Sequence, residues 1–212
     1  MLLEPDTFPS RFALKDYDGR TKEGKARKEE IESKGLVALP VDDWDAVHHA
    51  AASVRSHPLA LRLVSEAKMV ETSMTWDTDL GPCRGRIDGY TVIANRGVLW
   101  DLKWSTGAHP SSFTRECFNR DIHSQLAFYR DGLLANDVKV DDCVVIAIES
   151  DAPYEVYLYR IVEKALEDGA RRNATRLETF SACVESEKWP GGMEQVIDLG
   201  LPAWVKEPEV VS

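Results

Sequence analysis

Residues 98–104, VLWDLKW, constrain the fold of this chain more than any other segment. The apolar start of the segment is typical of a buried strand, and the charged residues that follow indicate that the strand then meets a polar surface. Side chains alternate along a strand, so Asp101 and Lys103 share one face. The opposite face receives Trp100, Leu102 and Trp104. Charged residues at the end of an apolar strand predict a functional site, because active residues of open α/β sheets collect there.

The rest of the sequence predicts an α/β protein with a central mixed β-sheet flanked by helices, as a single domain over residues 1–212. Apolar and β-branched runs predict further strands at residues 68–76, 84–93, 143–149 and 155–162. Charge and capping patterns predict helices at 21–34, from Asp42 or Asp43 to Ser56, and at 59–66, 114–135 and 163–185. The first 20 residues are expected to form a loop, and Asn95-Arg96-Gly97 predicts a tight hairpin.

A second carboxylate, Asp88, closes the segment Arg84-Gly85-Arg86-Ile87-Asp88. If Asp88 and Asp101 end adjacent antiparallel strands, they can share one hard cation, and Mg²⁺ prefers one or two protein carboxylates together with water and phosphate oxygens. The carbonyl of Leu102 is a further candidate ligand, and Lys103 could offset negative charge in a transition state. Such a set suits hydrolysis of a phosphodiester. The alternative is a turn acid at Asp88 and a surface ion pair between Asp101 and Lys103.

Neighbouring residues favour the site over the surface ion pair. Arg84 and Arg86 share the face of Asp88, and Glu71 lies in the preceding strand. These residues would give the candidate metal site a basic flank suited to a phosphate.

A helix downstream of the site carries Gln125 and Tyr129, which lie four residues apart on one face. An amide beside a phenol can contact a phosphate or stack on a base. A core-facing tyrosine with a capping glutamine would fit the same spacing. His123 in this helix is expected at the helix surface and not as a metal ligand.

Composition excludes several other functions. The net charge of −10 argues against a surface that binds polyanions in general, although a nuclease can confine its basic groups to one channel. No two of the four cysteines are spaced as CxxC, so the sequence indicates neither a structural zinc site nor a thioredoxin-type pair. The longest apolar stretch, Cys143 to Ile148, is far too short for a membrane span, and the N-terminus has no secretory pattern, so we expect a cytoplasmic protein.

The motifs together resemble the PD-(D/E)xK nuclease superfamily, and within it the nuclease domain of exodeoxyribonuclease VIII, the RecE-type phage recombination exonuclease. The residues that carry the resemblance are Glu71, Arg84 to Asp88, Trp100 to Trp104, and His123-x-Gln125-x-x-x-Tyr129. It extends to the opening segments Leu2 to Phe8, Arg11-Phe12 and Thr21-x-x-Gly24-Lys25, and to Trp189-Pro190 and Leu201-Pro202-x-Trp204 near the end. It therefore covers nearly the whole chain in one order.

The resemblance implies a restriction-endonuclease-like core with a defined set of site residues. It implies that Asp88 and Asp101 bind the metal with the Leu102 carbonyl, and that Lys103 is the catalytic lysine. Glu71 corresponds to an acid of the strand before the site. The DNA contacts would be made by Gln125 and Tyr129, with Arg84, Arg86 and His123 beside them.

The resemblance also implies a reaction and its partners. The family uses Mg²⁺, with Mn²⁺ as a possible substitute, and degrades one strand of double-stranded DNA from the 5′ end. Relatives form homo-oligomeric rings, and they leave a 3′ overhang for a partner protein, a single-strand annealing recombinase. The expected location is the cytoplasm of a bacterial host or phage-infected cell.

One departure from the family keeps other functions open. The family has a helix before the opening segment that supplies a metal-binding histidine, and this helix is expected to be missing here. Two explanations stay open: the sequence is truncated and lacks that helix, or the metal site is short of one ligand. The alternatives are a RecB-like or restriction-type endonuclease on the same core, and a catalytically impaired DNA-binding or assembly module.

Overall fold

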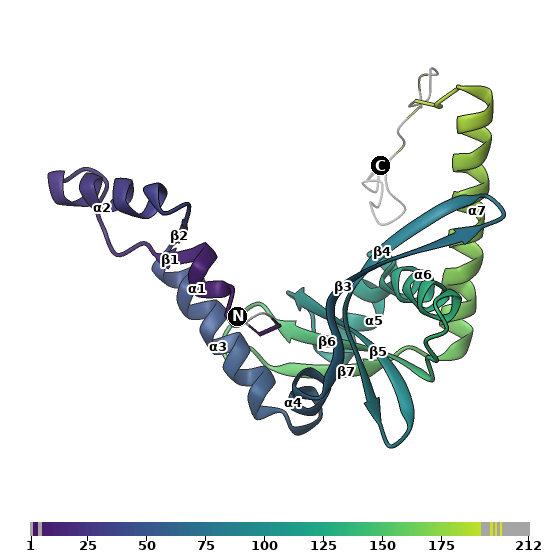
Figure 1. The fold of residues 1–212 in the computed structure, drawn as a ribbon, viewed down its shortest axis with the longest axis horizontal. Coiled ribbons are helices and arrows are strands. Elements are labelled where there is room, and N and C mark those ends of the chain that lie inside the picture. Colours follow the sequence, from purple (N-terminus) through teal and green to yellow (C-terminus); the bar gives the residue numbers. More distant parts are fainter. Residues whose placement is uncertain (1, 4–5, 192–195, 197, 199, 201–212) are drawn as a thin grey trace, which may run out of the picture.

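In the computed structural model, which describes residues 2–3, 6–191, 196, 198 and 200, the body is a five-stranded mixed sheet of order β3-β4-β5-β6-β7 (Figure 1). Its strands are β3 (Ala67–Thr78), β4 (Gly81–Ile93), β5 (Arg96–Ser105), β6 (Asp142–Glu149) and β7 (Val156–Arg160). Strands β5 and β6 run parallel, whereas the other neighbours are antiparallel. The predicted central mixed sheet is therefore confirmed. The predicted close of the chain at Leu201, Pro202 and Trp204 lies outside the described residues.

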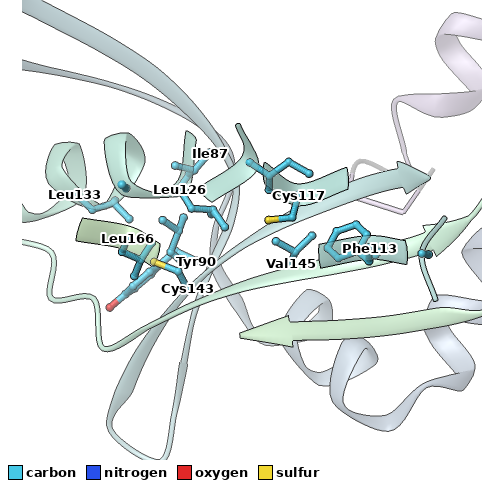
Figure 2. Close-up of a cluster of buried hydrophobic side chains, with 14 residues drawn as sticks. Ile87, Tyr90, Phe113, Cys117, Leu126, Leu133, Cys143, Val145 and Leu166 are labelled. Atoms are coloured by element: carbon cyan, nitrogen blue, oxygen red, sulfur yellow. The ribbon is translucent and has the colours of Figure 1, made fainter. Parts of the chain in front are cut away.

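Helices cover both faces of the sheet because its central strands are apolar on both sides. One face packs against α5 (Pro110–Asn119), α6 (Ile122–Ala135) and α7 (Glu163–Ser186), in a core that includes Leu99, Phe113 and Leu126 (Figure 2). The other face packs against α3 (Val41–Ser56) and α4 (Pro58–Ser65), around the fully buried Trp100. The alternation predicted for β5 is confirmed, since Leu99 and Trp100 enter different cores.

The N-terminal segment is not the predicted loop. It contains α1 (Phe8–Arg11) and β1 (Phe12–Leu14), and β1 pairs in parallel with β2 (Val37–Leu39), which follows α2 (Lys22–Ser33). Figure 1 shows these elements together at the end of α3 that lies away from the main sheet. The ring of Phe8 lies 5.1 Å from that of Phe12 and 5.4 Å from that of Trp44 on α3. We call this N-terminal group of elements, α1, β1, α2 and β2, the arm. Its aromatic contacts with α3 join residues far apart in the sequence, so local turn signals do not predict them.

The predicted helix 114–135 is two helices, and this correction places the groups near the site. Helix α5 ends at Asn119, and α6 starts at Ile122 after Asp121, whose φ of 53° is left-handed. The carboxylate of Asp121 pairs with Arg172 and Arg176 of α7, at 3.2 and 2.5 Å. The break therefore rests on tertiary ion pairs that sequence periodicity does not contain.

Two predicted boundaries also move. Helix α3 begins at Val41 after Pro40, so Asp42 and Asp43 lie in its first turn, where the helix dipole favours acids, and neither is the N-cap. The turn between β4 and β5 is formed by Ala94 and Asn95, both with positive φ, as a two-residue hairpin turn of type I′ requires.

Candidate functional site

A fork between β4 and β5 forms the centre of the candidate site. The two strands pair from the hairpin turn as far as Gly89 opposite Trp100, and β5 then continues beside β6 alone. Asp88 is the first residue of β4 beyond the ladder, and its Oδ2 accepts a hydrogen bond of 2.8 Å from the backbone N–H of Leu102. The carboxylate of Asp88 thus takes a donor that would otherwise belong to the strand ladder.

Gly89 and Trp100 build this fork. The indole of Trp100 lies across Gly89, where a Cβ would come within 1.9 Å of Cζ2 of the ring. The ring is held by a 2.8 Å hydrogen bond from its Nε1 to Oγ1 of Thr91, and that hydroxyl donates to the carbonyl of Leu63 at 2.6 Å. Each of the two acids, Asp88 and Asp101, is the chain neighbour of one member of this packed pair.

Asp101 is a buried carboxylate, not part of a surface ion pair. Its side chain is 1% exposed and that of Lys103 is 14% exposed, with Nζ of Lys103 2.5 Å from Oδ2 of Asp101. Lys103 is thus the ion-pair partner of Oδ2, whereas Oδ1 has no partner among the described residues. Burial and the charge of Asp88 raise the pKa of Asp101 to about 6, although the charges of Lys103 and Arg120 oppose the shift.

The raised pKa of Asp101 predicts a measurable dependence of stability on pH. The contribution of Asp101 to the free energy of unfolding in EDTA should fall by about 3 kcal/mol between pH 3 and 7, because the folded state keeps the proton up to a pKa of about 6, whereas the unfolded state releases it near 3.8. The contribution is fully present only below the unfolded pKa of 3.8 and is lost as the pH rises through 6. Urea unfolding of the wild type and of Asp101→Asn, compared at each pH, isolates this residue. A constant difference between the two proteins would contradict the prediction.

The donor set at the fork fits a hard cation. Asp88 and Asp101 supply two carboxylates, and Oδ1 of Asp101 has no partner among the described residues. The N–H of Leu102 faces β4, and because the N–H and C=O of one strand residue point the same way, its carbonyl faces the fork as well. Within the described ranges, no three residues among the His, Cys, Asp and Glu side chains come together as a metal cluster. Two carboxylates and a carbonyl, completed by water, are oxygen ligands of the kind that Mg²⁺ binds. A tetrahedral zinc site would instead be built mainly from cysteine and histidine ligands.

Glu71 lies beside the fork on β3. It falls between the pairs that Val70 and Thr72 make with β4, which places it across from Asp88. Its Oε2 is 2.7 Å from Nη2 of Arg86. The φ of Glu71 is 46°, a left-handed conformation that costs energy for a residue other than glycine and is concentrated at functional sites.

A groove lies between the β3–β4 hairpin and α6. Gln125 and Tyr129 line it from α6, where Nε2 of Gln125 donates to the Tyr129 hydroxyl at 3.2 Å. Arg84 and Arg86 line it from β4. A Cβ on Gly85 would stand 3.0 Å from two carbons of the Tyr129 ring, so the phenol packs against the strand at Gly85. The structure therefore brings the predicted amide, phenol and arginines into one groove.

His123 is not at the helix surface, and that part of the sequence interpretation is wrong. Its side chain is fully buried, its ring centroid is 4.4 Å from that of Phe118, and its Nε2 is 3.3 Å from Oδ2 of Asp168 on α7. Helices α6 and α7 approach closely here, since a Cβ on Gly169 would lie 2.8 Å from the carbonyl oxygen of His123. In this position His123 fixes α6 against α7 and does not reach the groove.

Two residues of α5 that were not among the predicted site residues reach the end of β5. Oε2 of Glu116 accepts a 2.5 Å hydrogen bond from the Ser105 hydroxyl, and Nη1 of Arg120 donates to the carbonyl of Trp104 at 3.3 Å and to Glu116. The spacing of four residues indicates that Glu116 and Arg120 lie on one face of a helix. The sequence does not indicate which part of the protein that face contacts.

The chain belongs to the family described as PDDEXK-like domain of unknown function (DUF3799), whose model matches residues 1–197. The fold and the fork of acids with a lysine agree with the PD-(D/E)xK class that this description names. No curated protein matches the chain significantly.

One solved structure supports the same fold. The crystal structure of a "Putative exonuclease" from Eubacterium rectale is similar over 87% of this chain and 72% of its own, with a TM-score of 0.53 and 15% identity. The crystal structure of SSO0001 aligns with 76% of this chain and 68% of its own, at 13% identity and a TM-score of 0.38. At such identities the first likeness supports the fold alone, and the second carries no argument.

None of the helices in the described part of the chain combines the length and apolarity that crossing a bilayer requires.

Proposed function

We propose that this protein is a Mg²⁺-dependent deoxyribonuclease that degrades double-stranded DNA from the 5′ end, in the manner of the RecE-type exonucleases. The observation that carries the proposal is the fork, where two carboxylates, Asp88 and the buried Asp101, lie beside the single ammonium of Lys103, and Oδ1 of Asp101 has no partner among the described residues. One lysine does not offset two carboxylates and an unpartnered buried oxygen, and a metal cation held between the two acids would supply the missing positive charge.

Each residue of the fork then has a defined role. Asp88, Asp101 and the carbonyl of Leu102 would hold Mg²⁺, which when bound polarises a phosphodiester and lowers the pKa of water. Lys103 is held by Asp101 at the polar end of β5, where its ammonium stabilises the negative charge that develops on the phosphoryl oxygens. Glu71 holds Arg86 at the rim of the fork.

The groove gives the cleaved strand its path to the fork. Arg84 and Arg86 supply positive charge, and Gln125 and Tyr129 supply a hydrogen-bonding and stacking pair. Confining these groups to one groove allows a chain of net charge −10 to bind DNA locally. The resemblance supports the further proposals of a homo-oligomeric ring around DNA, an annealing recombinase as partner, and a bacterial or phage-infected cytoplasm.

The test uses the purified protein on two DNA substrates in Mg²⁺. We expect a linear duplex with one labelled 5′ end to be shortened from that end, and a covalently closed circle to stay intact. EDTA should stop the reaction, and Mn²⁺ should restore it. Nicking of the closed circle would instead identify an endonuclease of the RecB-like or restriction type.

A non-catalytic DNA-binding or assembly module is the second candidate. It is favoured by the small donor set, since only two carboxylates meet at the fork among the described residues. Calorimetry with Mg²⁺ and Mn²⁺ separates the two functions. DNA binding without metal binding or digestion would establish the module and refute the nuclease.

A further inference from the structure

Arg120 is a second cation at the polar end of β5. It caps the C-terminus of α5, and its Nη1 donates to the carbonyl of Trp104, the residue that follows Lys103. The side chain is nevertheless 47% exposed, which leaves it open to a ligand.

The guanidinium of Arg120 is fixed in place yet keeps one edge available. Its hydrogen bonds to Trp104 and to Glu116 both use Nη1. Among the described residues, none accepts a hydrogen bond from Nε or Nη2 of Arg120. The Nε–Nη2 edge is a planar pair of donors, and such an edge binds a phosphate with two parallel hydrogen bonds.

The surrounding charges explain why this edge would take an anion. Glu116 offsets part of the charge of Arg120 but is itself held by the hydroxyl of Ser105 at 2.5 Å. Lys103 is committed to Asp101. Arg120 is therefore a pre-positioned donor beyond the lysine along β5, with little conformational entropy left to lose on binding.

We propose that Arg120 binds, through its Nε–Nη2 edge, the DNA phosphate next to the scissile phosphate on the cleaved strand. The inference rests on the proposed nuclease function and adds a positioning residue to it. Arg120 would fix the register of the strand, because a phosphate held one nucleotide away from the fork places the scissile phosphate between Asp88, Asp101 and Lys103. The family motifs in the sequence do not include this position.

The experiment replaces single phosphates of a duplex by neutral methylphosphonates and measures single-turnover cleavage in Mg²⁺ at enzyme concentrations below saturation. For the wild type, neutralising the neighbouring phosphate should lower the rate by about tenfold to a hundredfold, as loss of a charge-assisted bidentate contact does. Arg120→Gln should lower the rate on the natural duplex by a similar factor. In that variant the methylphosphonate should then have no additional effect at this position.

Three variants separate phosphate binding from a structural role of Arg120. Arg115→Gln removes an equal charge from an exposed position on the same helix and should leave the methylphosphonate effect as large as in the wild type. Glu116→Gln removes the partner of Arg120 and should increase DNA affinity if the arginine binds phosphate, but should reproduce the loss if it only tethers α5. Arg120→Lys should recover part of the rate through its charge.

The outcomes also separate this inference from the proposed function. If the wild type digests DNA and Arg120→Gln responds to every methylphosphonate as the wild type does, Arg120 binds no phosphate and the nuclease stands. If the wild type digests no DNA, the proposed function fails first. Duplex affinity in Ca²⁺ then tests Arg120 alone, and an affinity of Arg120→Gln equal to that of the wild type would overturn the assignment.

Discussion

Asp101→Asn is expected to reduce Mg²⁺-dependent DNA hydrolysis by at least about a thousandfold, because a metal site at the fork contributes several kcal/mol of transition-state stabilisation. The asparagine keeps the shape of the side chain but removes the charge that would hold the cation and the partner of Lys103. The measurement is the initial rate on a linear duplex at saturating Mg²⁺, with folding checked by circular dichroism and metal binding by calorimetry.

Asp77→Asn is the matched control for this prediction. Asp77 is an exposed carboxylate on β3, the edge strand of the same sheet, so its loss removes the same charge without touching the fork. Lys103→Ala should retain metal binding and lose about a hundredfold to a thousandfold in rate, as loss of one electrostatic donor to a transition state does. A rate for Asp101→Asn within tenfold of the Asp77→Asn rate would refute the assignment of Asp101 as a metal ligand.

Gly89→Ala is expected to lower the free energy of unfolding by about 3 kcal/mol, the upper part of the usual range for overpacking a well-packed core. The added methyl group would stand 1.9 Å from the fully buried ring of Trp100. The ring cannot withdraw freely, since its Nε1 is bonded to Thr91. Urea unfolding at pH 7 in EDTA measures the loss, and Gly19→Ala, at a site with open space, should change stability by less than about 0.5 kcal/mol.

The same substitution tests whether this packing positions the acids. Gly89 is the neighbour of Asp88, so displacing the strand there should cost about a hundredfold in rate, the usual effect of a misplacement of about 1 Å at a reacting centre. Adding Trp100→Leu to Gly89→Ala should recover part of the stability, because the two residues are in contact and their effects are then not additive. Full activity in Gly89→Ala would show that the fork does not depend on this contact.

The strands were predictable because their signal is local. Apolar alternation around Leu99, Trp100 and Asp101 correctly assigned the two faces of β5, and each face enters a separate core. The helices were predicted less well where tertiary contacts decide them. The break at Asp121 depends on arginines more than fifty residues later in α7, and the arm around Phe8 depends on Trp44 of α3.

The site was predictable in its members but not in its geometry. The sequence identified Asp88, Asp101 and Lys103 as candidate site residues but left open that they are surface groups. The burial of Asp101 and Lys103 in the structure decides against the surface alternative. His123 shows the limit of helical spacing, which places a residue on a face but does not say what packs against that face. Arg120 was not singled out because its relation to the fork depends on where α5 ends.

The sequence by itself determined the order of the elements, the two faces of β5, and the acids and lysine at its polar end, because alternation and residue chemistry act over a few neighbouring positions. The tertiary structure alone decided that β4 and β5 part at Gly89, that Asp101 is buried with Lys103 as its ion-pair partner, and that α5 brings Arg120 to the strand end. These features depend on packing between different segments of the chain. The indole of Trp100 over Gly89, for example, fixes the point where β4 and β5 separate, which no local sequence pattern specifies.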